Sequence, residues 1–107
     1  MTENIHTIRK RSGHMEIFDP DKIRRAITRA FASTGESVTD AQLNDMTGWI
    51  TAQLQEGSEV EQIQDLAEQA LMENGFYKTA KAYILYRQTH ARMREIVNRL
   101  TELAQDP

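Results

Sequence analysis

The chain has 107 residues, of which 39% are hydrophobic. It contains 13 Lys and Arg residues and 16 Asp and Glu residues, which gives a net charge of −3. This length predicts one domain with a single hydrophobic core. The sequence has no cysteine and only scattered histidines, which excludes disulfides and the usual metal-ligand patterns, and no signal peptide or membrane-spanning apolar run is recognisable, so we expect a cytoplasmic protein.

The charges are divided along the chain. Residues 1–31 contain seven basic and four acidic side chains, residues 32–75 contain nine acidic and no basic ones, and residues 76–107 contain six basic and three acidic ones. Two basic ends therefore flank an acidic middle. If the ends meet in the fold, they form a cationic site for an anionic partner.

Residues 5–18 alternate loosely between apolar and polar positions around the sequence RSGH, which predicts a β-hairpin with Gly13 in its turn. Alternation along the strand would place Lys10 on one face and both Arg9 and Arg11 on the other. A solvated basic hairpin is the simplest interpretation, and a compact polyphosphate ligand is another. Nucleic acid is disfavoured, because the chain has no basic helix and no aromatic residues interleaved with its charges.

The first of four predicted helices follows the hairpin directly. Asp19 is a suitable N-cap, Pro20 fits the first helical position, and Gly35 is expected near the end. Apolar residues recur with the period of an amphipathic helix. They are Ile23, Ala26, Ile27, Ala30 and Phe31.

The next two helices are predicted from their ends. Thr39 and Gln42 form a capping-box pattern at the start of the second helix, and Gly57 is expected to stop it. The third helix follows the short segment SEV (58–60), which could add a strand to the hairpin. Asn74-Gly75 is expected to end this helix.

The fourth helix is predicted to be much longer than the others. It begins near Phe76 and has no Gly or Pro before Pro107, so about 28 residues would span some 42 Å. Its last turns should extend beyond the bundle with an apolar stripe that packs on a partner chain or leads into a further domain. The stripe consists of Met93, Ile96, Val97, Leu100, Leu103 and Ala104. Arg87 lies among earlier apolar positions, where an unpaired charge would be costly, so we expect a buried partner or a bound phosphate there.

Common catalytic and nucleotide motifs are missing from the sequence. It contains neither G-x-x-x-x-G-K-[ST] nor G-x-G-x-x-G, and no readable Ser/His/Asp arrangement. The polyphosphate interpretation would use Lys22 and C-terminal basic side chains as a clamp, with Glu16 or Asp19 accepting a hydrogen bond from an amino group such as that of adenine. Tyr83 and Tyr86 are interpreted as core aromatic residues rather than as base-stacking platforms.

Three segments, IRKRSGHMEIFDPDKIRRAI, VEQIQDLAEQAL and AKAYILYRQTHARMRE, resemble the ATP-cone domain in their order and spacing. The resemblance covers residues from about 5 to 95. The family is found at the N-terminus of ribonucleotide reductase subunits and, after a zinc ribbon, in a bacterial repressor of reductase genes. It implies an α+β, mostly α fold, in which a four-helix bundle is capped by a small three-stranded sheet. Residues 96–107 would be a C-terminal helix extension or a linker to a further domain or partner.

The resemblance implies allosteric binding of ATP or dATP, with Mg held through the phosphates, and control of reductase activity through subunit assembly. The partners would be catalytic or radical-generating reductase subunits, or further copies of the chain. No catalytic cysteine or glycyl-radical motif is present, so we expect a regulatory domain rather than an enzyme. The parent looks most like anaerobic glycyl-radical or cobalamin-dependent reductases. An interaction or oligomerisation module that uses the last helix without binding nucleotide, and the cone of a nucleotide-sensing transcriptional regulator, remain alternatives.

The resemblance also assigns the residues around the base and the sugar. Ile8 would flank the base, and Glu16 and Asp19 would accept hydrogen bonds from the adenine amino group. Val60 and Gln64 match positions that contact the sugar and the triphosphate. These five residues come from the hairpin, from the start of the first helix, and from the third helix and its approach.

Basic residues are assigned to the phosphates in the same way. Lys10 and Arg11 would bind the phosphates from the hairpin, and Lys22 would contact a phosphate or the ribose from the start of the first helix. Arg87 and His90 fall where the last helix supplies a basic contact in the family. His90 departs from the pattern, because a neutral histidine holds phosphate less firmly than lysine does.

Overall fold

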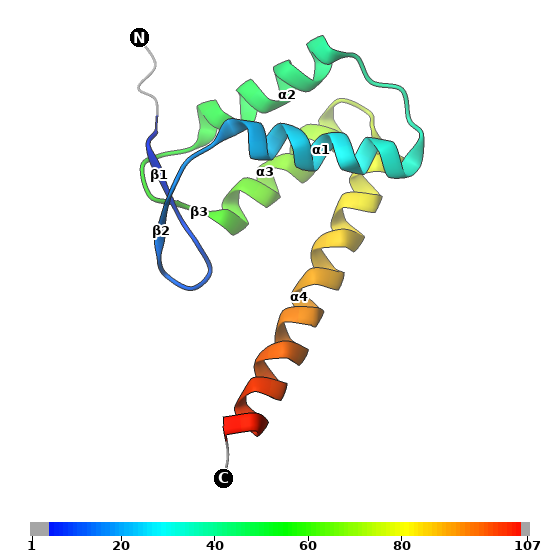
Figure 1. The fold of residues 1–107 in the computed structure, drawn as a ribbon. Helices are drawn as coiled ribbons and strands as arrows, with labels where there is room; N and C mark the ends of the chain where they lie inside the picture. Colours follow the sequence, from blue (N-terminus) through cyan, green and yellow to red (C-terminus); the bar gives the residue numbers. More distant parts are fainter. Residues whose placement is uncertain (1–4, 106–107) are drawn as a thin grey trace.

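The computed structural model describes residues 5–105, which form four helices and three short strands (Figure 1). This architecture confirms the predicted α+β, mostly α fold class. The elements in chain order are β1 (Thr7–Arg9), β2 (Met15–Ile17), α1 (Pro20–Thr34), α2 (Asp40–Gln53), β3 (Ser58–Glu59), α3 (Val60–Glu73) and α4 (Tyr77–Gln105).

The three strands form a small mixed sheet in the order β2-β1-β3, which we call the β-cap. β1 pairs with β2 in antiparallel register, with Ile8 opposite Glu16, and with β3 in parallel register, with Ile8 opposite Ser58. The turn of the hairpin contains Gly13 at a φ of 88°, which favours glycine. The predicted third strand at residues 58–60 is therefore confirmed at Ser58–Glu59. It leads directly into α3, just as β2 leads into α1, so the β-cap lies at the start of both helices.

The predicted helix starts are confirmed by their capping bonds. The side chain of Asp19 accepts a hydrogen bond from the backbone N of Asp21 at 3.0 Å, and α1 ends at Gly35 in the left-handed conformation. Thr39 and Gln42 form both bonds of the capping box at the start of α2.

The predicted end of α2 is wrong by several residues. The helix stops at Gln53, because Leu54 is extended and turns its side chain into the core. Gly57, at a φ of 79°, lies in the following loop, where its backbone N donates to the carbonyl O of Thr7 at 3.0 Å. Gly57 therefore links the loop after α2 to β1 and does not end the helix.

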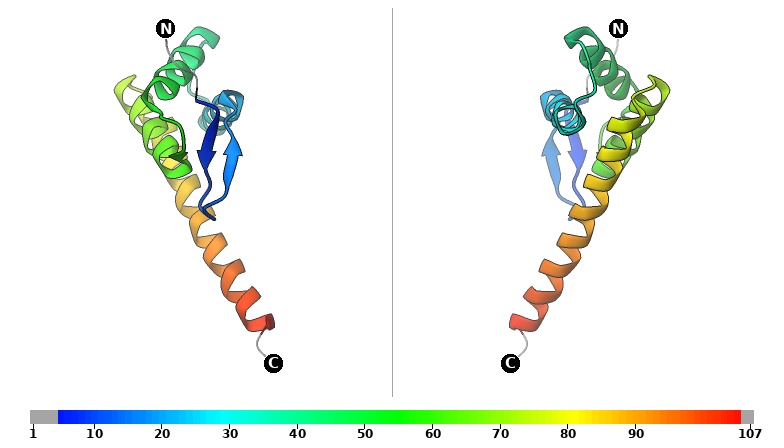
Figure 2. Two further views of the ribbon diagram at one scale, coloured as in Figure 1. Left: turned by 90° about the vertical axis from the view of Figure 1, so that its left-hand side faces the viewer. Right: turned by 90° about the vertical axis from the view of Figure 1, so that its right-hand side faces the viewer.

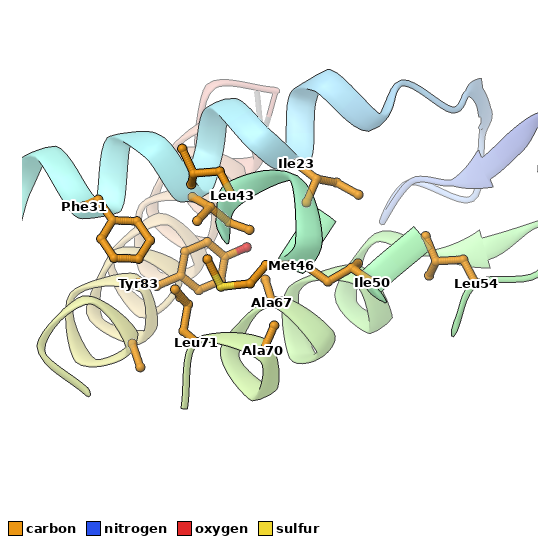
Figure 3. Packing of buried hydrophobic residues seen from close by; sticks show 12 residues of the cluster. Ile23, Phe31, Leu43, Met46, Ile50, Leu54, Ala67, Ala70, Leu71 and Tyr83 are labelled. Carbon is orange, nitrogen blue, oxygen red and sulfur yellow. The ribbon is translucent and has the colours of Figure 1, made fainter. Parts of the chain in front are cut away.

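One apolar cluster joins the four helices (Figure 3). The predicted stripe of α1 lies in this cluster or packs against it, and the rings of Phe31 and Phe76 meet edge to face with centroids 4.9 Å apart. Full burial of each large aliphatic side chain contributes about 1.5–3 kcal/mol. The buried members are Ile23, Ile27, Phe31, Leu43, Met46, Ile50, Leu54, Ala67, Ala70, Leu71, Ala80 and Tyr83.

The second half of α4 extends away from the bundle, as predicted (Figures 1 and 2). Every described side chain from Gln88 to Ala104 is exposed, including the apolar stripe that begins at Met93. Within residues 5–105, none of the helices is both long enough and apolar enough to cross a lipid bilayer. The bundle alone therefore carries the core, and the distal part of α4 presents an uncovered apolar surface.

Candidate functional site

A cavity of about 180 Å³ lies between the β-cap and the bundle, and we call it the cap cavity. Its lining comes from β1, β2, α1, α3 and α4 and from the approach to α1. The lining residues are Ile8, Glu16, Ile17, Phe18, Asp19, Lys22, Ile23, Ala26, Val60, Ile63, Gln64 and Tyr83. Six of the ten site residues predicted from the sequence belong to this set, although they are far apart along the chain.

The walls of the cap cavity are mainly apolar. Ile8 is buried on the inner face of β1, and Val60 and Ile63 face the cavity from the first turns of α3. Tyr83 closes the opposite side from α4 and is also part of the core. Burial raises the pKa of its phenol to about 12, so the side chain is neutral at physiological pH. Such a lining suits a flat, largely apolar ring.

Two carboxylates stand at the α1 side of the cap cavity. Glu16 lies opposite Ile8 on the sheet, and its Oε1 is 3.3 Å from the Nζ of Lys22 and 3.6 Å from the Nζ of Lys10. Asp19 caps α1 with Oδ1, while its Oδ2 is 3.6 Å from a terminal nitrogen of Arg25. Both carboxylates retain acceptor capacity toward the cavity, because each oxygen can accept more than one hydrogen bond.

A second cavity, of about 230 Å³, adjoins the hairpin turn, and we call it the turn cavity. Its lining residues are Arg9, Lys10, Arg11, Gly13, Glu59, Val60 and Glu61. Val60 lines both cavities, so the two are neighbours at the start of α3. No side chain caps this end of α3, which leaves its first backbone N–H groups available to a ligand. Free N–H groups beside basic side chains are a common arrangement for binding phosphate.

The turn cavity corrects the expected placement of the hairpin cations. Because β1 ends at Arg9, strand alternation does not extend to Lys10 and Arg11, and all three side chains line the same cavity. Arg11 reaches across to α3, where its terminal nitrogen donates to Oε1 of Gln64 at 2.7 Å and its Nε is 3.3 Å from Glu61. The basic turn is thus fastened to the helix that carries the predicted sugar and triphosphate contacts.

Arg87 and His90 lie outside the lining of both cavities. Arg87 binds Asp65 at 3.0 Å and also Glu68, both on α3, and its side chain is 19% exposed. Burial would lower the pKa of its guanidinium, but the bonds to Glu68 and Asp65 outweigh that effect and raise it. Of the two explanations expected for this charge, the structure shows the carboxylate partner. His90 is exposed, and the centroid of its ring lies 4.1 Å from the centroid of the Tyr86 ring.

The cap cavity also contains residues that the sequence did not assign to a site. Phe18 and Tyr83 are examples, and Tyr83 was interpreted only as a core aromatic residue. Tyr86 is 52% exposed, so the expectation of a core residue is wrong for Tyr86, whereas it is correct for Tyr83. A stripe position on α4 can be read from the sequence, but its distance from β1 depends on how the helices cross.

Comparisons with known proteins match the same segment of the chain. The family model of the ATP cone domain matches residues 6–92, which include both cavities. The alpha subunit of ribonucleoside-diphosphate reductase from Chlamydia muridarum (strain MoPn / Nigg) is 39% identical over 99 residues, covering 80% of this chain and 10% of that protein. The corresponding subunit from Chlamydia pneumoniae is 36% identical over 104 residues, covering 87% of this chain and 10% of that protein.

The chain spans about a tenth of the length of these curated relatives. The shared part is therefore the segment that contains the β-cap, the bundle and both cavities. Because the family model covers most of the chain, the chain belongs to the ATP cone domain family.

Proposed function

We propose that this chain is an allosteric domain that binds ATP or dATP and controls the activity of a ribonucleotide reductase through subunit assembly. The observation that carries the proposal is the pair of adjoining cavities, one apolar with carboxylates at its edge and one basic beside an uncapped helix start. An adenine nucleotide has the same division between an apolar base bearing an amino group and an anionic triphosphate.

In the proposed complex the adenine ring enters the cap cavity between Ile8 and Tyr83. Its amino group donates to Glu16 or Asp19, and the sugar lies near Val60. The triphosphate follows the start of α3 into the turn cavity, and Mg is held through its phosphate oxygens. The lining of the two cavities supports this order, because Val60 belongs to both.

Basic residues divide into two groups in this proposal. Lys10, Arg11 and Lys22 are the phosphate ligands, because each lines one of the two cavities. Arg87 and His90 stay predictions. Arg87 would have to exchange its bonds to Asp65 and Glu68 before it could bind phosphate, because those two carboxylates occupy its guanidinium.

The regulatory role rests on the family and on the relatives, which are named as alpha subunits of ribonucleoside-diphosphate reductase. We propose that residues 1–95 form the nucleotide-binding unit and that 96–107 lead toward a further domain or partner. The partners would be reductase subunits or further copies of the chain. The chemistry of the parent reductase stays a prediction.

Calorimetric titration with ATP and with dATP in the presence of Mg tests the proposal. Ligand at a hundred times its dissociation constant should stabilise the fold by about 2.7 kcal/mol, which a thermal shift also detects. Absence of both binding heat and thermal shift at millimolar nucleotide would contradict the proposed function.

The variant Lys10→Glu should abolish most of the binding without unfolding the domain, because Lys10 is exposed and its charge reversal places an anion beside the phosphates. Lys78→Glu is the matched control, since this exposed lysine lies in the first turn of α4 and lines neither cavity. Circular dichroism should show the same helical content in both variants. Equal loss of ATP binding in both would place the site elsewhere.

A second candidate function is an interaction module that works through the distal part of α4. The exposed apolar stripe from Met93 to Leu103 favours it, because soluble proteins seldom leave such a continuous stripe uncovered. Light scattering with and without ATP separates the two functions. A monomer in both conditions would contradict the interaction module and leave nucleotide binding as the function to be tested by calorimetry.

A further inference from the structure

One carboxylate oxygen holds two of the proposed phosphate ligands. Oε1 of Glu16 lies 3.3 Å from the Nζ of Lys22 and 3.6 Å from the Nζ of Lys10, and the side chain of Glu16 is 31% exposed. The two lysines come from different elements, one from the hairpin turn and one from the first turn of α1. Glu16 is thus a counter-ion shared by both lysines, and its single negative charge leaves this group with a net positive charge.

Glu16 also faces the cap cavity. It lies opposite the buried Ile8 on the sheet and lines the cavity together with Asp19 and Gln64. The carboxylate that the resemblance assigns to the amino group of the base is therefore the carboxylate that binds the lysines. Both ammonium groups lie beside Oε1, so an amino group that draws the carboxylate into the cap cavity moves this oxygen away from both lysines at once.

Arg11 is neutralised in a different way. Its partners are Gln64 and Glu61, and Glu61 lines the turn cavity but not the cap cavity. The carboxylate beside Arg11 is thus placed near the proposed phosphates and away from the proposed base. Glu61 offers a matched comparison with Glu16, because both are glutamates paired with a proposed phosphate ligand.

We infer that Glu16 makes phosphate binding depend on the base. An amino group on the base draws the carboxylate toward the cap cavity and weakens its contacts with Lys10 and Lys22, which then turn to the triphosphate. This inference rests on the proposed function and adds a second role for Glu16, that of an exchangeable counter-ion. A base with an amino group is then selected in two ways, through its own hydrogen bond to Glu16 and through the stronger phosphate binding by the released lysines.

Two ligands that lack the amino group should bind weakly, because they do not draw Glu16 away from the lysines. Inosine triphosphate places a carbonyl oxygen where adenine has its amino group, and this oxygen repels the carboxylate. Inorganic tripolyphosphate has no base at all. In both cases Glu16 stays with the lysines, so the phosphates must compete with it for the same ammonium groups.

Calorimetry of the full chain with ATP, inosine triphosphate and tripolyphosphate tests the inference, with the Mg concentration held constant. Glu16→Gln keeps the size of the side chain and removes its charge. We expect this variant to bind tripolyphosphate about two- to fivefold more tightly, as for the loss of exposed ion pairs, and to prefer ATP over inosine triphosphate roughly tenfold less. Glu61→Gln should tighten ATP and tripolyphosphate by the same factor and leave the preference for ATP unchanged.

A second measurement separates counter-ion exchange from simple repulsion between Glu16 and phosphate. In a chain with Lys10→Met and Lys22→Met, Glu16→Gln should no longer improve the binding of tripolyphosphate, because the lysines through which it acts are gone. General repulsion would persist in that background and would overturn the inference. So would unchanged or weaker tripolyphosphate binding by Glu16→Gln in the wild-type background.

Failure of the inference and failure of the proposed function are distinguishable. If wild-type protein binds ATP while Glu16→Gln leaves tripolyphosphate binding unchanged, only the inference is wrong. If wild-type protein binds tripolyphosphate but not ATP, the proposed function is wrong. If it binds neither, both are wrong.

Discussion

At the scale of single residues, Glu56 shows how an exposed carboxylate can fasten the β-cap. It lies in the loop before β3, and its carboxylate accepts hydrogen bonds from the backbone N of His6, at 3.1 Å, and from the backbone N and the hydroxyl of Thr7. The bonds with the Thr7 side chain and the His6 backbone lower the pKa of Glu56 below 4.5. The loop and the first strand of the hairpin are therefore joined by hydrogen bonds that are strongest when the carboxylate is ionised.

This pKa shift predicts an acid-sensitive contribution to stability. Because the pKa of Glu56 is lower in the folded protein, its contribution is present above pH 4.5 and is lost as pH falls through the folded pKa. Glu56→Gln should therefore be less stable than wild type at neutral pH and should show a smaller loss of stability in acid. Urea unfolding across this range measures both effects. Glu102→Gln, on the exposed distal part of α4, is the control, and an equal change in its pH profile would contradict the assignment to Glu56.

Tyr83 gives the opposite dependence at high pH. Burial raises its pKa to about 12, whereas an unfolded tyrosine ionises near pH 10. The neutral phenol is favoured by the fold, so its contribution is fully present below pH 10 and is lost as pH rises toward 12. We expect a loss of about 2–3 kcal/mol over that window, as two pKa units imply. Tyr83→Phe should remove this loss, and Tyr77→Phe, at a side chain 66% exposed, should not.

At the scale of elements, the start of α4 is capped by a residue from the end of α1. Glu36 follows the terminal Gly35 of α1, and its Oε1 accepts from the backbone N of Thr79 at 2.9 Å and from its hydroxyl at 2.6 Å. The fully buried Thr79 also shares a hydrogen bond of 2.9 Å with Thr34. A negative charge at this position interacts favourably with the positive, N-terminal end of the α4 helix dipole. The hydrogen bonds also fix the start of α4 against the end of α1.

Removing this cap should cost stability. Glu36→Ala is expected to lower the free energy of unfolding by about 1–2 kcal/mol, because it leaves the backbone N–H of Thr79 without its acceptor and its hydroxyl with Thr34 as the one remaining partner. Glu36→Gln should cost less, since its amide oxygen can still accept both bonds. Urea unfolding at neutral pH compares the two. Equal losses would mean that charge, rather than hydrogen bonding, is the source of the stabilisation.

The elements also show what can and cannot be predicted from the sequence. The start of α1 and the capping box of α2 depend on residues within one turn, so Asp19, Thr39 and Gln42 predict them directly. The end of α2 depends instead on Leu54 reaching the core and on Gly57 bonding to β1, which are tertiary contacts. For the same reason the family resemblance assigned six of the twelve residues that line the cap cavity but not Tyr83.

At the scale of the whole molecule, the acidic middle of the chain forms ion pairs with cations from both basic ends. Acidic residues of α3 bind Arg11 from the hairpin and Arg87 from α4, and Asp40 of α2 binds Arg24 of α1 at 3.3 Å. One cation from each basic end therefore pairs with α3, Arg11 with Glu61 and Arg87 with Asp65 and Glu68. The cations that line the two cavities all come from the first basic end, and an anion bound there would compete with Glu16 and Glu61 for them.

The distal part of α4 should be dispensable for stability but not for association. Its side chains from Gln88 to Ala104 are all exposed, so Ile96→Glu combined with Leu100→Glu removes no buried contact and keeps good helix formers. We expect the free energy of unfolding to change by less than about 0.5 kcal/mol and ATP binding to be unchanged. Leu71→Ala, at a fully buried position, should cost about 2–5 kcal/mol in the same assay. If wild-type chains associate through this stripe, light scattering should show weaker association in the double variant. A large loss of stability would instead mean that the distal helix packs on the bundle in solution.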